Sequence, residues 1–419
     1  MNNNIQKYPA YKPSGAEWLG EIPEHWRLTK LGTRFEERRT KVSDKDFPPL
    51  SVTKNGILPQ LDSAAKTNDG DNRKLVKAGD FVINSRSDRK GSSGIANTDG
   101  SVSLINIVME PKDIHPTYCN YLLKCYNFIE EFYRMGHGIV ADLWTTRYDE
   151  MKSIMVGIPP LIEQTSIASF LDRKTTQIDQ AIVQKERMIE LLKERRQILI
   201  HNAVTLGINP DVNMKDSCVE WIEKIPEHWE VKRLKYVVEI LKRIIGFEGP
   251  DVLSITQKGI KVKDITSGEG QLAMDYSKYQ LIYKGEFAMN HMDLLTGYVD
   301  ISKFDGVISP DYRVFTSKSK DIIDSYLLIL FQVGYKSKIF YRYGQGVSQL
   351  GRWRFPSENF NNFKIPIPPI IEQIEIVKNI EKQTAKIATA ISCKEREIEK
   401  LKEYKATLIN SAVTGKIKV

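Results

Sequence analysis

Residues Pro159–Ala203 read PPLIEQTSIASFLDRKTTQIDQAIVQKERMIELLKERRQILIHNA, which begins with two prolines and contains no later proline and no glycine. A proline pair suits the start of a helix, where no amide donor is needed. The positions that follow recur in steps of four and three, the spacing of a coiled-coil seam. The seam positions are Leu171, Thr175, Ile178, Ile182, Lys185, Ile189, Leu192, Arg196, Leu199 and Ala203. This stretch predicts one long helix whose narrow apolar stripe needs a partner.

The same stretch occurs again 209 residues later, as Pro368–Ala412. Its seam positions are Ile380, Thr384, Ile387, Ile391, Lys394, Ile398, Leu401, Lys405, Leu408 and Ala412. Polar positions recur together with apolar ones, so we expect the two helices to pack on each other, each carrying a globular unit. A plain dimerisation device or a coiled coil between molecules would give the same pattern, and the seam alone leaves these alternatives open.

The globular parts repeat as well. WLGEIPEHWRLTKL (Trp18–Leu31) returns as WIEKIPEHWEVKRL (Trp221–Leu234), an offset of 203 residues. The offset reaches 208 between FYRMGHG (Phe132–Gly138) and FYRYGQG (Phe340–Gly346). Small insertions account for the change in the offset, so the chain contains an internal duplication.

Each copy has one coarse order of elements: short β-type runs, an amphipathic helix, a glycine-containing loop, and a short strand leading into the double proline. In the first copy the amphipathic helix places Tyr118, Leu122, Cys125, Ile129 and Phe132 on one face. The predicted fold class is α+β. Two α/β domains are separated by two long antiparallel helices that form an intramolecular coiled coil with a pseudo-two-fold repeat.

The predicted boundaries follow from the repeats and from turn-rich breaks in the sequence. They are 1–17 for a loose N-terminal arm, 18–158 for the first globular domain, 159–205 for the first long helix, 206–217 for a connector, 218–367 for the second globular domain, 368–413 for the second long helix, and 414–419 for a C-terminal tail.

Composition restricts the class of protein. The 419 residues include 61 Lys and Arg against 53 Asp and Glu, a net charge of +8 that fits a polyanionic partner. The N-terminus has no apolar core typical of a signal peptide, and no apolar run is long enough to span a membrane. The four cysteines form no CxxC pair, so we expect no zinc site, no disulfide framework and a cytoplasmic location.

Catalytic motifs are absent where an enzyme would carry them. There is no GxxxxGK[ST] phosphate loop, no GxGxxG after a strand, no Asn-Pro-Pro-aromatic motif of amino-methyltransferases, and no HExxH metal pattern. The six histidines are scattered, and His25 and His228 lie beside Trp in matched copies of IPEHW, where packing is favoured over catalysis.

Candidate DNA-reading residues lie where the two copies share a frame but differ in sequence. Asn84–Gly94 (NSRSDRKGSSG) differs from Asn290–Gly297 (NHMDLLTG), and Ile139–Arg147 differs from Val347–Phe355. Arg and Lys can contact phosphates and guanine, Asn and Gln can pair with adenine, and Ser or Thr can serve either edge. Solvated loops have the same composition, so the pattern singles out no one residue. It does predict that at least one loop in each copy contacts DNA. The candidates are Arg86, Arg89, Lys90, Ser92, Ser93, Arg134, His137, Trp144, Thr145 and Arg147 in the first copy, and Asn290, His291, Arg342, Gln345, Ser348, Gln349, Arg352 and Arg354 in the second.

Antiparallel pairing of the helices predicts globular domains at opposite ends, related by an approximate two-fold axis. Duplex DNA also has local two-fold axes, so such a protein could read two separated half-sites. Half-sites about one turn apart (~34–36 Å) would present both to one side of the duplex.

The chain resembles the specificity (S) subunits of type I restriction-modification systems over nearly its whole length. In the first half the resemblance rests on Glu17–Pro23 with His25–Trp26, on Gly79–Phe81, on Pro159–Gln164 with Ile167, and on Ala203–Thr205. In the second half it rests on Pro368–Gln373 with Ile376 and on Ala412–Gly415. The second copy departs from the first pattern with Ile222–Lys224 in place of Leu19–Glu21.

This resemblance implies two target-recognition domains, each reading half of a bipartite, asymmetric double-stranded DNA sequence. It implies a non-catalytic subunit that binds no cofactor directly. Two methyltransferase (M) subunits carrying S-adenosylmethionine would dock on it, and ATP-dependent restriction (R) subunits could join them, with no membrane involved.

Two other classes of function remain to be weighed against a DNA-specificity subunit. A self-sufficient nuclease or methyltransferase would act on DNA as the isolated chain, given Mg²⁺ or S-adenosylmethionine. A coiled-coil adaptor that binds only proteins would tolerate alanine at Arg86, Arg89 and Lys90 without loss of activity.

Overall fold

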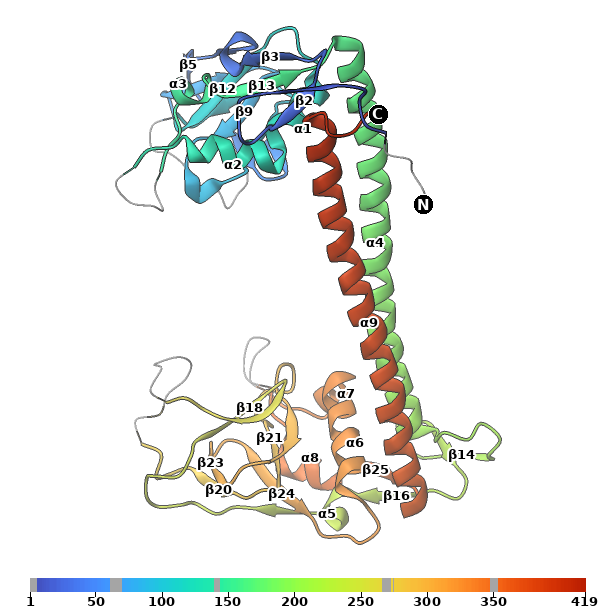
Figure 1. Ribbon diagram of the computed structural model, residues 1–419. Coiled ribbons are helices and arrows are strands. Elements are labelled where there is room, and N and C mark those ends of the chain that lie inside the picture. Colours follow the sequence, from blue (N-terminus) through green and yellow to red (C-terminus); the bar gives the residue numbers. More distant parts are fainter. Residues whose placement is uncertain (1–5, 61–69, 139–143, 266–272, 274, 347–352) are drawn as a thin grey trace. The chain divides into compact units, whose positions relative to one another are not determined.

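The computed structural model describes residues 6–60, 70–138, 144–265, 273, 275–346 and 353–419. The chain divides into two compact units, shown in Figure 1: Met1–Lys185 with Glu395–Val419, and Glu186–Lys394. Each unit therefore groups a globular part with the helix ends that pack on it, and each long helix contributes one half to each unit. None of the helices in the described ranges is long and apolar enough to cross a membrane.

The two long helices begin directly after the proline pairs, as predicted. Helix α4 spans Leu161–Thr205, with 45 residues, and α9 spans Ile370–Val413, with 44 residues. The Gln164 N–H donates to the Pro160 carbonyl, and the Gln373 N–H to that of Pro369, both at 3.0 Å. The prolines thus supply carbonyl acceptors to the first turn without needing donors of their own.

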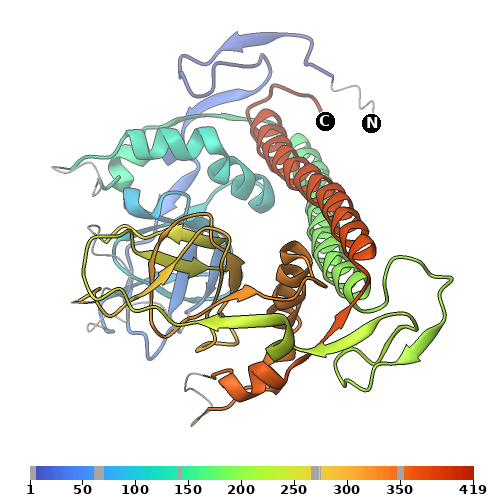
Figure 2. The ribbon, with the colours of Figure 1, turned by 90° about the horizontal axis from the view of Figure 1, so that it is seen from below.

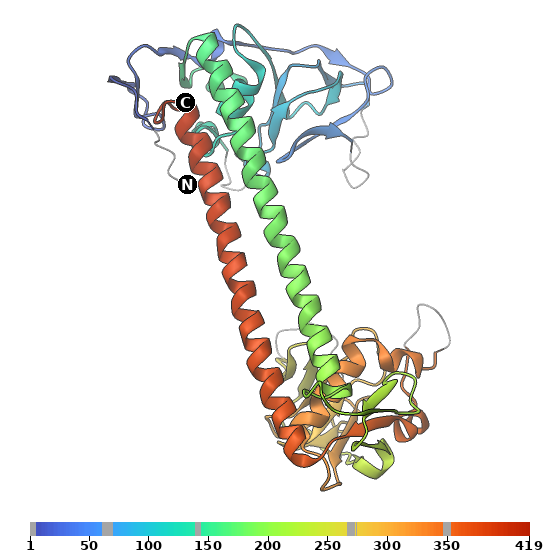
Figure 3. The ribbon, with the colours of Figure 1, turned by 90° about the vertical axis from the view of Figure 1, so that its right-hand side faces the viewer.

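Within each unit the two helix halves pack antiparallel. In the first unit Asp179 pairs with Lys405 at 2.6 Å, and Lys185 pairs with Glu397. Residue numbers therefore increase along one helix in the direction in which they decrease along the other. In the second unit Val204, at the end of α4, shares a core cluster with the start of α9. The paired halves lie side by side in Figures 1, 2 and 3. The predicted intrachain pairing is therefore confirmed.

The predicted seam is mostly buried. Its buried apolar members are Leu171, Ile178, Ile182, Ile189, Ile380, Ile387, Ile398 and Leu408. The partly buried members are Leu192, Leu199, Ile391 and Leu401. The seam lysines Lys185 and Lys405 make the ion pairs described above, which explains how polar residues are accommodated there.

The first globular part is built from short strands and helices. Its strands are β1 Tyr11–Pro13, β2 Glu21–Pro23, β3 Arg27–Lys30, β4 Phe35–Glu37, β5 Lys41–Val42, β6 Leu50–Thr53, β7 Gly56–Pro59, β8 Arg73–Val76, β9 Phe81–Asn84, β10 Ser93–Ile95, β11 Gly100–Val102, β12 Asn106–Pro111 and β13 Met155–Ile158. Its helices are η1 Leu31–Thr33, η2 Ser87–Arg89, α1 Pro116–Lys124, α2 Tyr126–Arg134 and α3 Tyr148–Met151.

The second globular part repeats this order with small differences. Its strands are β14 Met214–Asp216, β15 Lys224–Pro226, β16 Glu230–Arg233, β17 Val238–Leu241, β18 Leu253–Thr256, β19 Gly259–Val262, β20 Gln280–Ile282, β21 Phe287–Met289, β22 Val299–Ile301, β23 Gly306–Ile308, β24 Arg313–Ser317 and β25 Lys364–Ile367. Its helices are α5 Leu234–Val237, α6 Asp324–Lys336, α7 Ile339–Arg342 and α8 Ser357–Asn362.

The main sheet has the same topology in both units, whereas the three-stranded sheet β11-β8-β5 of the first unit corresponds to the two-stranded sheet β20-β23 of the second. The four-stranded antiparallel sheet has the order β10-β9-β12-β4 in the first unit and β22-β21-β24-β17 in the second. Strand β3 pairs with β13, and β16 pairs with β25. In both units, therefore, the strand that follows the IPEHW motif pairs with the strand that leads into a long helix. A small apolar core repeats as well: Leu50, Val76, Val82, Val102 and Val108 in one unit, and Leu253, Ile282, Ala288, Ile308 and Val314 in the other.

Two sequence predictions need correction. The single amphipathic helix of the first copy is two helices, because Cys125 has an extended backbone (φ −66°, ψ 150°) between α1 and α2. The break redirects the chain so that Phe128 packs edge-on against Trp18, with ring centroids 5.8 Å apart. The predicted face is still buried apart from Ile129, which is partly exposed.

The N-terminal arm is not loose in its described part. Tyr8 is buried, and β1 pairs with β2. Gln6 bridges Lys418 of the C-terminal tail through a backbone hydrogen bond of 2.8 Å. The described part of the N-terminal arm thus meets the C-terminal tail in the first unit, whereas in the second unit the chain is continuous through the connector 206–217. The first five residues lie outside the described range.

Candidate nucleic-acid interface

A repeated joint attaches each globular part to its long helix. Glu163 accepts hydrogen bonds from the Trp26 indole (3.1 Å) and the His25 ring (2.8 Å). Glu372 accepts the same two bonds from Trp229 (3.0 Å) and His228 (2.8 Å). Both tryptophans are fully buried, so the carboxylate satisfies an indole donor that water cannot reach. The two IPEHW histidines are therefore parts of a structural joint.

A tyrosine joins each globular part to the end of the other long helix. The Tyr118 hydroxyl lies 3.3 Å from the Val413 carbonyl, and the Tyr326 hydroxyl lies 3.2 Å from the Val204 carbonyl. Both tyrosines are completely buried, and burial raises their hydroxyl pKa well above the usual value. The Ala-Val-Thr helix ends found in the sequence thus mark a packing contact.

The two divergent loops of the first unit lie against each other. Residues 85–87 follow β9, and their backbone pairs with residues 144–146: the Ser87 N–H donates to the Trp144 carbonyl at 2.9 Å, and the Thr146 N–H to the Ser85 carbonyl at 3.0 Å. Thr145 also pairs with His137 of the glycine turn, with backbone distances of 3.1 and 3.2 Å. Three segments far apart in the sequence therefore form one small ribbon.

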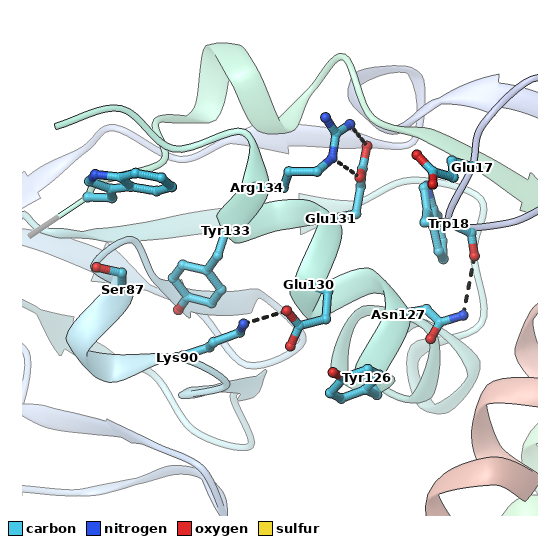
Figure 4. Close-up of a pocket in the computed structure, with 11 residues that line it drawn as sticks. Glu17, Trp18, Ser87, Lys90, Tyr126, Asn127, Glu130, Glu131, Tyr133 and Arg134 are labelled. Carbon is cyan, nitrogen blue, oxygen red and sulfur yellow. Dashed lines mark hydrogen bonds and ion pairs between the residues drawn. The ribbon is translucent and has the colours of Figure 1, made fainter. Parts of the chain in front are cut away.

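Most predicted DNA-contacting residues of the first unit are exposed on or beside this ribbon. Arg86, Arg89, His137, Trp144 and Arg147 are exposed, and Thr145 is partly exposed. Lys90 and Arg134 are exposed too, but each is ion-paired with a glutamate of α2. Figure 4 shows the pocket that Lys90 and Arg134 line together with Trp18, Tyr126 and Tyr133.

Ser92 and Ser93 do not fit the prediction. Both side chains are buried, with 6% and 0% exposure, because β10 returns along β9 and turns them into the sheet. Their hydroxyls cannot reach a nucleic acid in this arrangement, so the prediction is wrong for these two residues.

The second unit has an equivalent ribbon. The Phe355 N–H donates to the His291 carbonyl at 2.8 Å, and Gln345 and Arg354 exchange backbone hydrogen bonds of 2.8 and 2.9 Å. Gln345, Arg354 and Arg342 are exposed, whereas Asn290 and His291 are partly buried. Ser348, Gln349 and Arg352 lie outside the described residues.

A buried arginine that the sequence patterns did not single out lies under this second ribbon. Arg313, only 4% exposed, donates to the Phe355 carbonyl at 3.0 Å and to the Ser357 hydroxyl at 3.2 Å. Among the described residues it has no acidic partner, and burial lowers the pKa of its guanidinium to about 10. Burial also lowers the pKa of His291 to about 4, with Arg313 and Arg354 acting in the same direction.

Basic residues beyond the divergent loops also border the first ribbon. A second pocket is lined by Arg39 and Lys74 together with Arg86 and Arg147. Arg39 and Lys74 lie near Glu37, at 2.5 and 3.3 Å, so their charge is partly compensated. The sequence offered no divergence signal for them, because they come from β8 and the segment after β4. No cluster of metal-ligating side chains occurs within the described ranges.

Comparison with known proteins shows similarity to one family of proteins. The model of the type I restriction modification DNA specificity domain matches residues 226–400. The type I restriction enzyme MjaVIII specificity subunit of Methanocaldococcus jannaschii is 26% identical, over 95% of this chain and 94% of that protein.

Solved structures share the fold at low sequence identity. A chain from a structure on complex assembly and conformational transition of the type I R-M system has a TM-score of 0.65 and 13% identity, covering 94% of this chain and 98% of that one. The HsdS subunit from Thermoanaerobacter tengcongensis has a TM-score of 0.56 and 14% identity, with the same coverage.

Proposed function

We propose, from the premise that this chain belongs to the type I restriction enzyme specificity subunits, that each unit reads one half of a bipartite DNA target. The observation that carries the proposal is the ribbon repeated in both units. Segments that differ between the copies meet there, and their exposed side chains include Arg86, Arg89 and Arg354. Arginine can contact both phosphates and guanine edges, which are the groups that such a reader needs.

The chain itself recognises the DNA sequence, and its partner subunits carry the catalytic sites. Two methyltransferase subunits carrying S-adenosylmethionine dock on it, and restriction subunits can join them in the cytoplasm. Because the loops of the two units differ in sequence, the two half-sites differ as well.

The principal test uses the full chain together with its methyltransferase subunits. Methylation sequencing of cells with and without the gene gives the target, and duplexes carrying it are then tested for binding. We expect affinity to fall by about 100-fold or more when either half-site is scrambled, and to fall steeply with salt because phosphate contacts release counterions. Equal affinity for intact and scrambled duplexes would refute the proposal.

The paired helices are proposed to set the spacing between half-sites. Deleting one heptad from α4 and one from α9 keeps both seams in register but shortens each helix by about 10 Å, at ~1.5 Å per residue. The preferred spacer should shorten, or binding should fail. A deletion in α4 alone is the control, since it puts the seams out of register and should impair folding. Unchanged spacing in the double deletion would rule out this role.

A further inference from the structure

Two glutamates on α2 hold cations of the first unit's predicted DNA surface. Lys90 Nζ lies 2.6 Å from Glu130, and Arg134 donates two hydrogen bonds to Glu131, of 2.7 and 2.8 Å. Figure 4 shows both pairs, with the glutamates and cations lining one pocket. A fifth charged residue, Glu17, lines the same pocket.

These glutamates lie next to the ribbon that is proposed to read DNA. Lys90 directly follows η2, whose first residue, Ser87, is hydrogen-bonded to Trp144. A phosphate approaching Lys90 or Arg134 would therefore also approach a carboxylate. Like charges repel, and each carboxylate competes with the phosphate for its cation.

The second unit lacks this arrangement at the equivalent positions. At the offset of 208 that relates the two glycine turns, Glu130 corresponds to Lys338 and Glu131 to Ile339. Lys338 is exposed and has no acidic partner within the described part of the chain, and Ile339 is buried. Arg342, the counterpart of Arg134, has only a longer contact of 3.4 Å with Glu220, and both side chains are well exposed. One surface thus carries an acidic pair where the other carries a cation.

The pairs of the first unit can be exchanged for another anion. The side chains of Lys90 and Glu130 are 43% and 41% exposed; in the second pair Arg134 is 66% exposed and Glu131 14%. Both cations are therefore open to another anion, and ion pairs with such accessible cations are weak. A DNA half-site that also offers base contacts can replace them, whereas a random duplex offers only phosphates in return. The acidic pair therefore penalises non-specific binding more than specific binding.

We propose that Glu130 and Glu131 are specificity-determining residues of the first unit. They hold Lys90 and Arg134 against α2 until the correct half-site compensates for their release. The second unit, with Lys338 in this place, binds phosphates without such a restraint. The inference rests on the proposed function, since it presupposes that the first unit contacts DNA.

The test compares binding of two duplexes by the full chain in complex with its methyltransferase subunits. One duplex carries the target sequence identified by methylation sequencing, and the other has both half-sites scrambled. For the double variant Glu130→Gln with Glu131→Gln, we expect affinity for the scrambled duplex to rise about tenfold at low salt. Affinity for the target should rise less, so that the ratio between the two falls about threefold or more.

Two further variants act as matched controls. Glu36→Gln removes another exposed glutamate of the first unit, paired with Lys112 and not part of the ribbon, and should leave both affinities unchanged. Lys338→Glu introduces the acidic charge into the second unit and should lower affinity for the scrambled duplex.

Each outcome decides between distinct possibilities. If the wild-type complex shows no preference for the target, the proposed function fails. If the preference exists but the double variant leaves affinity for the scrambled duplex unchanged, or raises both affinities equally, the inference is overturned. Loss of methyltransferase binding in the double variant would also overturn it, because the glutamates would then serve a protein partner.

Discussion

The joints that attach each globular part to the long helices, and the ribbons at the candidate DNA surface, have diverged to very different degrees between the two units. At the joints the same donor meets the same acceptor twice, as for Trp26 with Glu163 and Trp229 with Glu372. At the ribbons the backbone pairing is repeated while the side chains are replaced. The difference indicates that the joint is fixed by buried hydrogen bonds, whereas the ribbon is a frame that accepts new side chains.

The charged residues at the two ribbons also differ between the units. The second unit has the buried Arg313 and the partly buried His291 beside its ribbon, where the first unit has Ile107 and Ser85 at the corresponding positions. The first unit instead pairs two of its surface cations, Lys90 and Arg134, with glutamates. The two surfaces share one frame but differ in which cations are buried and which are paired with glutamates, as expected if they read different half-sites.

The largest expected effect tests whether the two joints are equally tight. Gly415 (φ +75°) and Gly207 (φ +80°) each lie two residues after the end of a long helix. A Cβ on Gly415 would lie 2.3 Å from Pro23, whereas one on Gly207 would be no closer than 3.3 Å to its neighbours. We expect Gly415→Ala to destabilise the first unit by about 4 kcal/mol and Gly207→Ala the second by about 1–2 kcal/mol.

Urea unfolding followed by tryptophan fluorescence measures both variants, because Trp26 and Trp229 lie in the respective joints. Equal losses in the two variants would contradict the asymmetry. Gly56→Ala is a useful control: its φ is also positive (+116°), yet nothing surrounds the added Cβ, so only backbone strain should remain.

A second prediction tests whether each ribbon contacts a different DNA half-site. Changing Arg86, Arg89 and Lys90 together to Ala should lower affinity for the target by about 100-fold, since each such contact contributes roughly 1 kcal/mol or more. Scrambling the half-site read by the first unit should then cost nothing further. Arg342→Ala with Arg354→Ala should give the reciprocal result for the other half-site, and each variant serves as the control of the other. If both variants lost the same half-site, the assignment of one half-site per unit would be wrong.

The smallest expected effect concerns pH. Burial lowers the pKa of His291 from 6.5 to about 4, so the unfolded chain binds a proton there that the folded chain does not bind between these values. The stability of the second unit is therefore full above about pH 6.5 and falls as the pH drops toward 4, by about 2 kcal/mol at pH 4.5.

His291→Ser, which introduces the residue found at the equivalent position of the first unit, should flatten this dependence. Thermal melting at pH 7 and pH 4.5 compares the variant with the wild type. Some dependence should persist, because burial also lowers the pKa of His201 in the same unit. A variant that lost as much stability as the wild type at pH 4.5 would show that His291 is not responsible.

Much of the architecture could be predicted from local patterns. The heptad positions, the proline pairs and the constant offset of 209 residues predicted two long helices that pack within one chain, and the paired halves confirm this. The candidate surface was predicted less completely. Divergence between the copies identified the two loops, but it also selected Ser92 and Ser93, which are buried, and it missed Arg313.

The sequence by itself determined the duplication and the seam, because both are periodic patterns that neighbouring residues express without reference to the rest of the chain. Only the tertiary structure decided that the chain ends meet at Gln6 and Lys418, and that Lys90 and Arg134 are held by glutamates. It also decided that a buried arginine, Arg313, lies under the second ribbon. These outcomes depend on burial and on contacts between segments distant in the sequence, which set the charge and accessibility of a side chain irrespective of its type.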